Sequence, residues 1–363
     1  MSFLTDKAYK LSLAVLSCFS AFVLLFGCVS CVFTALKSRK NGDAEAASSY
    51  ISDTAYGGER IVSDTSPETF DSLIETLGEL KYRYPDDIKI FTAGYSENGR
   101  EILMYTLGSG EKKALIVGGI HAREHISTKY LLKVTEDYCA AAHSATGCYG
   151  EYNINSIFQE YTFCVIPCVN PDGLEIILSR DKAKSGVRIS KLSEYKANAN
   201  GVDINRNFPL AWESIDNGVT SPADYYFKGY SSASAKETQV LMSLCDENEF
   251  QFMLSFHIKG NLLYWGDNYK TYNNPLYKAF AEDIASACGF FVTEPTEKAE
   301  NYGGGFENWF RHTYDRAGVC VELGDYKNKI KPCGDENYAD FNGFVNYEKS
   351  SFAIAAAAVS QNK

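Results

Sequence analysis

The chain has 363 residues, of which 45% are hydrophobic and 22% are charged, and its net charge is −11 at pH 7. The first 40 residues hold five basic residues and one acidic residue, so the rest of the chain carries 30 basic and 45 acidic residues, a net charge of −15. This acidic balance argues against a nucleic-acid partner, and the hydrophobic content suits a globular enzyme.

The N-terminal segment contains 26 consecutive uncharged, mostly apolar residues, from Leu11 to Leu36. As a helix, this stretch is long enough to cross a hydrocarbon core of about 30 Å. The alternative is a secretory signal peptide, whose apolar region usually spans about 7 to 15 residues. Basic residues flank both ends, so the positive-inside rule leaves the orientation open. We expect residues 1–40 to anchor the chain in a membrane and the large domain to be extracytoplasmic, or secreted if the segment is cleaved.

The polar, Ala- and Ser-rich stretch 41–56 has no apolar periodicity and is predicted to be a linker. Residues 57–363 then suit one α/β domain. Its first helix is predicted to begin with Ser66 as cap and Pro67 in the first turn, and to end at Tyr84. Short apolar runs predict strands at 88–93, 102–107, 114–117, 161–167, 251–256 and 319–323.

Two further helices are predicted between these strands. The first covers 127–142, and a capping box formed by Ser234 and Glu237 predicts the start of another that runs through Cys245. The alternation of helices and strands predicts an α/β fold with a single mixed β-sheet flanked by helices.

Three of the eleven cysteines lie in the apolar N-terminal stretch and eight lie beyond it. An even number permits disulfides in an exported domain, and Cys139 and Cys148 are close enough in sequence to form one. In a domain of this size, however, buried free thiols are the default expectation.

The first candidate site residues follow the apolar run in ALIVGGIHAREH, which delivers His121 and Glu124 after two glycines. Imidazole and carboxylate groups are both good zinc ligands, and the end of a strand is a rigid place from which to present them. The alternative is a local surface pair. His125 completes an H-x-x-E-H pattern, which is typical of one class of metallopeptidases, but that pattern needs both histidines on one helix. Gly118 and Gly119 disfavour a helix already running at His121.

The other candidates come from distant strands. QFMLSFH ends a second apolar run in His257, which is the natural third zinc ligand. VCVELG places the single acidic residue Glu322 inside an apolar run. Burying a carboxylate costs free energy, so a buried carboxylate usually has a functional role. We expect Glu322 to act as a general base that accepts a proton from water. The alternative roles are a strand-end core histidine for His257 and a structural ion pair for Glu322.

A polar cluster in GVDINRNF suggests substrate recognition. Arg206 can grip a carboxylate through two parallel hydrogen bonds, and Asn205 can add another. The alternative is an Asn/Asp-rich turn that carries a surface arginine.

Taken in order, these segments resemble the zinc carboxypeptidase family typified by carboxypeptidase A. The resemblance implies one zinc ion on His121, Glu124 and His257, hydrolysis by zinc-activated water with Glu322 as general base, and a substrate carboxylate held by Asn205 and Arg206. Arg123 lies where the family has a substrate-contacting arginine. The segments that carry the resemblance are GIHARE, NPDG (170–173), GVDINRNF, SFH, GGGFENWF and VELG.

Within this family, YKANANGVDINRNF, SFHIKGNLLYW and GGGFENWF are more similar to the bacterial γ-D-glutamyl-L-diamino acid endopeptidases than to digestive carboxypeptidases. The resemblance implies a peptidoglycan stem peptide as substrate, and we expect a monomer. The alternatives are an ordinary metallocarboxypeptidase that releases C-terminal residues, an N-acyl amino acid deacylase and a non-catalytic wall-peptide binding module.

Two positions depart from the family pattern. Ser185 stands where digestive members place an arginine that polarises the scissile carbonyl, and neither Arg180 nor Arg188 can be assigned to this role. The mobile tyrosine of the family falls at Glu300, and Tyr302, two residues later, is the candidate substitute.

Overall fold

The structure is a computed structural model that describes residues 59–181, 184–269, 274–295, 298–325 and 338–363. The predicted membrane anchor and linker lie outside the described residues. Within the described part, none of the helices combines the length and the apolar character needed to cross a membrane.

An eight-stranded mixed sheet forms the centre of the domain and confirms the predicted fold class. Its strand order is β1-β2-β6-β3-β7-β10-β8-β9. The central strands β6, β3, β7 and β10 are parallel, and β1 and β2 pair antiparallel to their neighbours. At the other edge, β8 pairs antiparallel with β10 and parallel with β9. The strands are β1 (Ile88–Tyr95), β2 (Glu101–Leu107), β3 (Lys112–Gly118), β6 (Tyr161–Ile166), β7 (Phe250–Ile258), β8 (Leu262–Tyr264), β9 (Phe291–Val292) and β10 (Ala317–Leu323), with a separate pair β4 (Cys148–Tyr149) and β5 (Tyr152–Asn153).

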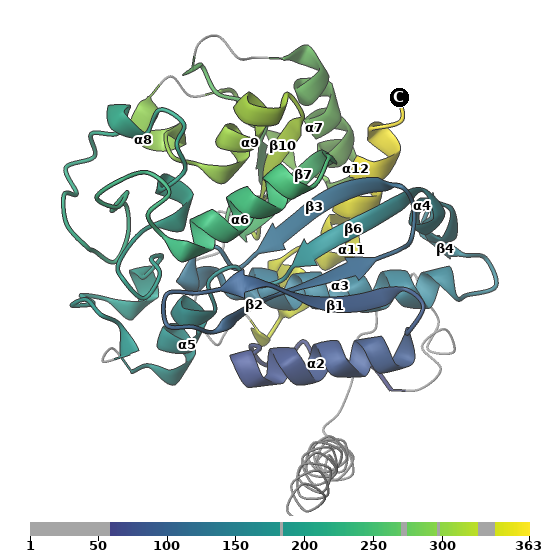
Figure 1. The fold of residues 1–363 in the computed structure, drawn as a ribbon. Coiled ribbons are helices and arrows are strands. Elements are labelled where there is room, and N and C mark those ends of the chain that lie inside the picture. The colour runs from purple at the N-terminus through teal and green to yellow at the C-terminus, as the bar shows by residue number, and fades with distance from the viewer. Residues whose placement is uncertain (1–58, 182–183, 270–273, 296–297, 326–337) are drawn as a thin grey trace, which may run out of the picture. The chain divides into compact units, whose positions relative to one another are not determined.

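Helices cover both faces of this sheet (Figure 1). One face packs against α2, α3, α4, α7 and α12, and the other packs against α6 and α9. The helices are α2 (Phe70–Arg83), α3 (Ile126–Ala142), α4 (Ile154–Glu160), α5 (Pro171–Ser179), α6 (Lys236–Glu247), α7 (Pro275–Cys288), α8 (Ala299–Tyr302), α9 (Phe306–Tyr314), α10 (Phe341–Phe344), α11 (Tyr347–Ser350) and α12 (Ala353–Ser360).

The two-sided covering explains why the central strands read as continuous apolar runs. In β3, Ala114 and Ile116 join the core on one face, whereas Leu115 and Val117 join the core on the other. Successive side chains of a strand point to opposite faces, so a strand buried on both sides needs apolar residues at every position. Such strands leave their polar residues at the ends, where a site can form.

The first helix begins later than the sequence predicts. Thr69, not Ser66, is the N-cap of α2, and Pro67 precedes the helix. Thr69 Oγ1 accepts a hydrogen bond from the Ser72 amide, and the Thr69 amide donates to Ser72 Oγ, so this capping box satisfies two free donors of the first turn. The helix ends at Arg83 with Tyr84 as C-cap, as predicted.

In α6, the predicted capping box does not form, because both of its side chains make tertiary contacts instead. Ser234 Oγ accepts a hydrogen bond from Asn207 Nδ2. The Glu237 carboxylate accepts hydrogen bonds from the Glu97 amide and Asn198 Nδ2. The helix begins at Lys236, one residue before Glu237, and its N-cap is Ala235.

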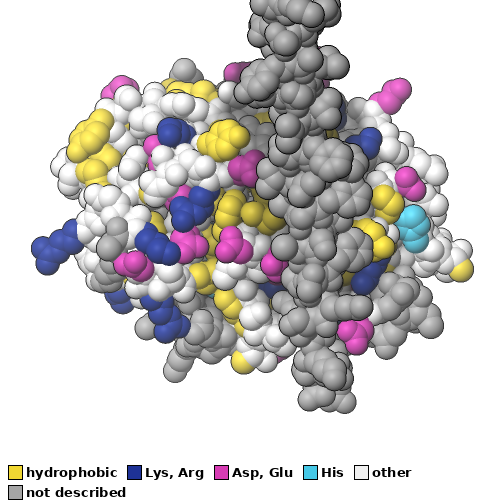
Figure 2. Space-filling view, turned by 60° about the horizontal axis from the view of Figure 1, so that its bottom comes forward, with side chains coloured by type: hydrophobic (Ala, Val, Ile, Leu, Met, Phe, Trp, Pro, Cys, Tyr) yellow, Lys and Arg dark blue, Asp and Glu magenta, His cyan; other side chains and the backbone are white. Residues whose placement is uncertain are grey.

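The cysteines of the described residues are free thiols, and all but Cys148 are buried. The suggested Cys139–Cys148 disulfide is therefore not formed, and the default expectation of buried thiols holds. Figure 2 shows one face of the domain, on which acidic and basic side chains are interspersed.

Candidate active site

The site forms at the carboxyl ends of three neighbouring parallel strands. His121 follows β3 after a turn at Gly119, which has a φ of +61°, and His257 lies near the end of β7. Glu322 lies on β10 in register with His257, so the two side chains belong to adjacent strands. The short 3-10 helix η2 (Ala122–Glu124) brings Glu124 back toward His121.

Three buried donor atoms converge at this point. His121 Nδ1 lies 3.0 Å from Glu124 Oε2, His257 Nδ1 lies 3.0 Å from the same oxygen, and the two Nδ1 atoms are 3.2 Å apart. Ligands at zinc distances in a tetrahedral arrangement lie about 3.3 Å from one another. The spacing and the His/Glu/His donor set therefore fit a zinc ion, and these residues are candidate metal-binding groups.

The opposite nitrogen of each histidine faces a partner that orients its ring. Asp203 Oδ1 lies 3.3 Å from His121 Nε2. His257 Nε2 lies 2.9 Å from Ser255 Oγ and 3.3 Å from Glu307 Oε1. A carboxylate that accepts the proton of one nitrogen leaves the other nitrogen available to a metal, as in other histidine metal sites.

The charges around the triad favour a cation. Burial alone would raise the pKa of Glu124, but the charges of His121 and Lys196 outweigh it and hold that pKa well below its usual value. Burial alone would lower the pKa of His257, but its hydrogen bonds to Glu124 and Glu307 raise it to about 10. The raised pKa of His257 shows that the carboxylates of Glu124 and Glu307 stabilise a positive charge at this position.

Glu322 has the environment expected of a proton acceptor. Burial, followed by repulsion from Glu124, raises its pKa to about 7. Its Oε2 is buried and has no hydrogen-bond partner among the described residues. No arginine within the described part of the chain pairs with it, so the alternative of a structural ion pair is not supported.

Asn205 and Arg206 lie together on the 3-10 helix η5 (Ile204–Arg206), two and three residues after Asp203. Asn205 Oδ1 accepts a hydrogen bond of 2.7 Å from the Phe306 amide, and Arg206 Nη1 donates to the Asn205 carbonyl at 2.6 Å. The Arg206 guanidinium lies over the Tyr226 ring, 5.9 Å from its centroid.

The glycine-rich turn before α9 packs directly on this pair. Gly304 has a φ of +64°, and a Cβ atom there would lie 2.1 Å from the Arg206 carbonyl oxygen. The Phe208 amide donates to the Gly304 carbonyl at 3.0 Å. Only glycine allows this approach, which fixes Asn205 and Arg206 relative to α9.

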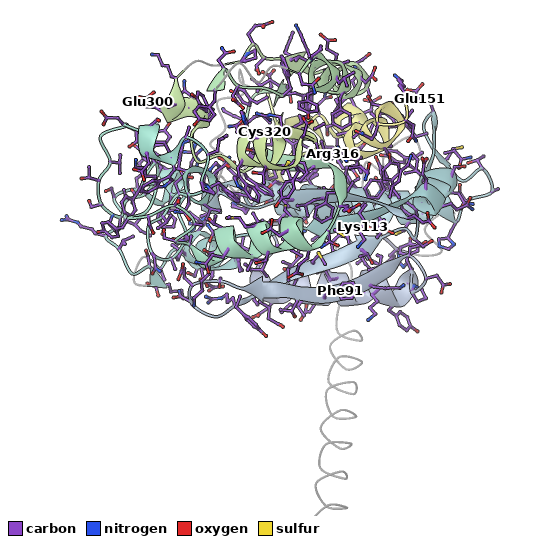
Figure 3. All side chains as sticks on the ribbon, turned by 45° about the horizontal axis from the view of Figure 1, so that its top comes forward. Phe91, Lys113, Glu151, Glu300, Arg316 and Cys320 are labelled. Atoms are coloured by element: carbon purple, nitrogen blue, oxygen red, sulfur yellow. The ribbon has the colours of Figure 1, made fainter. Side chains whose placement is uncertain are left out.

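Of the two remaining predicted site residues, Arg123 lies beside the triad and Tyr302 lies at the end of α8. Arg123 Nε lies 3.8 Å from Glu124 Oε1, beside the triad. Tyr302 is 7% exposed and lies at the end of α8 with its ring 6.1 Å from that of Tyr269. No contact within the described residues joins Tyr302 to the triad, and its surroundings indicate packing. Glu300 lies on α8, at the edge of the domain in the view of Figure 3.

The other histidines have structural partners. His125 precedes α3, and its Nδ1 lies 2.7 Å from the Tyr338 hydroxyl, so it does not join His121 on one helix face. His143 pairs with Asp87, and His312 pairs with Asp267. The H-x-x-E-H interpretation therefore does not describe this site.

Sequence reasoning did not identify four residues that surround the triad. Ser255 could have been found, because it lies two positions before His257 and therefore on the same face of the strand. Asp203, Glu307 and Lys196 occur within recognised segments, but no local pattern says what they face. Glu307 links two parts of the site, since its Oε2 also lies 3.5 Å from Asn205 Nδ2.

Known proteins resemble this chain in sequence and in fold. The chain is 26% identical over 284 residues to the γ-D-glutamyl-L-diamino acid endopeptidase 1 of Lysinibacillus sphaericus, a match that covers 75% of this chain and 69% of the relative. It is 30% identical over 250 residues to the uncharacterized protein YqgT of Bacillus subtilis, covering 65% of each. The solved structure of carboxypeptidase A from Helicoverpa armigera has the same fold, with a TM-score of 0.63 at 18% identity, covering 83% of this chain and 76% of that structure.

The family model described as zinc carboxypeptidase matches residues 73–349, which include the whole candidate site. His121, Glu124 and His257 form a group that could hold the zinc ion of this family. The chain therefore belongs to the zinc carboxypeptidase family and is a zinc metallopeptidase.

Proposed function

We propose that this protein hydrolyses cell-wall peptides at the bond between γ-D-glutamate and a diamino acid. The hydrolytic part of this proposal rests on the buried carboxylate of Glu322, whose Oε2 has no hydrogen-bond partner among the described residues, together with the metal-binding geometry of the His121–Glu124–His257 triad. The name of the Lysinibacillus relative supports the choice of bond.

In this proposal His121 Nδ1, Glu124 Oε2 and His257 Nδ1 hold the zinc ion. When bound, zinc supplies Lewis acidity that makes water a better nucleophile and polarises a carbonyl group. Asp203 and Glu307 keep the two imidazole rings oriented for this purpose.

Glu322 moves the proton. It accepts a proton as the water oxygen bonds to the carbonyl carbon, and it donates that proton to the amine nitrogen as the carbon–nitrogen bond breaks. Its raised pKa makes both the charged and the protonated form accessible near neutral pH. No covalent intermediate with the protein is required.

Arg206 and Asn205 hold the substrate. A guanidinium grips a carboxylate with two parallel hydrogen bonds, and the Asn205 amide, held by Phe306 and Glu307, adds a donor. In an endopeptidase the pair would bind a carboxylate of the diamino acid, and in a carboxypeptidase it would bind the C-terminal carboxylate. Arg123, beside the triad, is proposed as a further substrate contact.

We also propose that residues 11–36 hold the chain at a membrane with the catalytic domain extracytoplasmic. The length and apolar character of this stretch support the proposal. Cell fractionation, combined with protease digestion of intact cells, tests it. Recovery of the full-length chain in the cytoplasmic fraction would contradict it.

The experiment for the activity uses the full chain in detergent, with and without a zinc chelator. Its substrates are a muropeptide with the γ-D-glutamyl-diamino acid bond, a peptide with a free C-terminus and the same peptide amidated. We expect cleavage of the muropeptide, loss of that activity on chelation, and recovery with added zinc. Release of C-terminal residues from the free peptide alone would instead assign carboxypeptidase activity. Zinc binding without hydrolysis would favour a deacylase or a binding module.

A further inference from the structure

Lys196 lies beside the metal-binding triad, and the sequence analysis assigned no arginine to polarise the scissile carbonyl. Lys196 lies in an extended segment beside η2, where its amide donates to the Asp224 carbonyl at 2.7 Å and its carbonyl accepts from the Ala122 amide at 3.2 Å. Its neighbours Tyr195 and Ala197 are fully buried in the core. The Lys196 side chain, in contrast, is partly exposed and reaches Glu124 in the site.

The ammonium group of Lys196 faces the triad. Its Nζ lies 3.2 Å from Glu124 Oε1, whereas the other oxygen of that carboxylate faces the two histidines. The side chain is 21% exposed, so it contacts both the protein and the space open to a substrate. Burial and Glu124 raise the pKa of Glu322, and the charge of Lys196 opposes this rise.

Other cations are less well placed. Arg180 and Arg188 are exposed. Arg206 is directed toward Asn205 and Tyr226. Arg123 is farther than Lys196 from the same oxygen of Glu124, 3.8 Å against 3.2 Å.

We propose that Lys196 is a catalytic residue that stabilises the negative charge developing on the scissile carbonyl oxygen. A carbonyl placed between the triad and Glu322 has this ammonium group at its side. The charge appears when the water oxygen bonds to the carbonyl carbon and disappears when the carbon–nitrogen bond breaks, and Lys196 keeps its proton throughout. Preorganised charge of this kind acts mainly on the transition state. The proposal rests on the hydrolysis proposed above.

The test compares Lys196→Met, Lys196→Arg and the control Lys191→Met, whose lysine lies on the same segment with a 57% exposed side chain. We expect kcat of Lys196→Met to fall by about 100- to 1,000-fold with little change in KM. Lys196→Arg should recover part of the rate, and Lys191→Met should behave as wild type. Zinc affinity should not fall in Lys196→Met, because a neighbouring positive charge opposes a bound cation.

A second readout does not depend on turnover. A phosphinic dipeptide with a free carboxylate mimics the tetrahedral centre, and its affinity for the zinc-loaded protein should fall in Lys196→Met by about the same factor as kcat/KM. Affinity for the planar dipeptide, measured in a Glu322→Gln background, should stay nearly constant. Unchanged phosphinate affinity, or a loss of zinc that explains the loss of rate, would overturn the assignment. If the wild type cleaves none of the peptides, the proposed function fails, while the phosphinate measurement still decides the role of Lys196.

Discussion

At the scale of single residues, the site combines a metal-binding triad with carboxylates of two kinds. Glu124 and Glu307 form ion pairs with histidines, which keep both carboxylates charged, whereas Glu322 Oε2 is buried without a hydrogen-bond partner among the described residues. Burial lowers the cost of protonating Glu322, so its pKa is raised to about 7. The same residue type therefore serves as ligand, orienting partner and proton acceptor, according to what surrounds it.

Replacing the proposed base tests this division of roles. Glu322→Gln should lower kcat by about 100- to 10,000-fold, the usual contribution of general acid–base catalysis, and should leave one zinc per chain, because Glu322 is not a candidate ligand. Turnover and zinc content by atomic absorption measure the two effects. The control is Glu294→Gln, whose side chain is 85% exposed. Activity that survives in Glu322→Gln would rule out the proposed mechanism.

Glu307 should affect metal and substrate together. Glu307→Gln removes the carboxylate that faces His257 Nε2, so zinc affinity should fall by about 10- to 100-fold. The amide also loosens Asn205, so KM should rise even when zinc is saturating. Competition with a zinc-binding dye measures the first effect and steady-state kinetics the second. Glu247→Gln, at an exposed position of α6, should change neither. An unchanged zinc affinity would show that Glu307 does not orient the ligand.

At the scale of elements, the position of α9 depends on a buried ionic cluster. Arg311 of α9 donates to Asp267 Oδ2 at 3.0 Å, and His312 Nε2 lies 3.0 Å from Asp267 Oδ1. Both Arg311 and Asp267 are almost fully buried, so each compensates the other. Because α9 also carries Glu307 and abuts the turn that holds Asn205, the cluster supports the site from outside.

Asp267→Asn should destabilise the protein by about 3–5 kcal/mol at pH 7, because Arg311 would lose its buried counter-charge. Burial raises the pKa of Asp267, but His312 and Arg311 outweigh it and lower that pKa. A carboxyl with a lowered folded-state pKa contributes stability above its unfolded pKa of about 3.9, and this contribution is lost as the pH falls through the folded value. The difference between wild type and variant in urea unfolding should therefore shrink below about pH 4. A pH-independent difference, or an equal effect of the exposed Asp216→Asn, would contradict this account.

At the scale of the whole molecule, residues 60–64 tie the start of the domain to α3. Arg60 Nη2 donates to Asp137 Oδ1 at 2.6 Å, and the Glu136 carboxylate accepts the amides of Ile61 and Val62 at 2.7 and 2.9 Å. Asp64 pairs with Lys133 at 3.2 Å. The α3 side chains in these contacts are buried, so this short segment neutralises charges deep in the fold.

A chain truncated to begin at Thr65 should therefore lose stability, by about 3–5 kcal/mol for each buried charge left without its partner. A chain that begins at Ser48 keeps these contacts and is the control. Thermal unfolding of both, with zinc present, measures the difference. Equal melting temperatures would show that the domain does not need residues 60–64.

The sequence predicted those features that depend on local pattern. The strands β3, β7 and β10 were recognisable because each is an apolar run that ends in polar or glycine residues. The first residues of the helices were harder to predict from the sequence. Ser234 and Glu237 match a capping box, but Asn207, Asn198 and Glu97 compete for their side chains in the folded chain.

By itself, the sequence determined the α/β class, the family and the residues that could bind zinc, because the periodicity of apolar residues and the order of motifs can be recognised in the linear sequence. Only the tertiary structure decided that Glu307 connects His257 to Asn205, that Glu322 Oε2 is buried without a hydrogen-bond partner among the described residues and that Lys196 faces Glu124. These are relations between side chains far apart in the chain, and their energies depend on distances and burial that appear only when the strands are assembled.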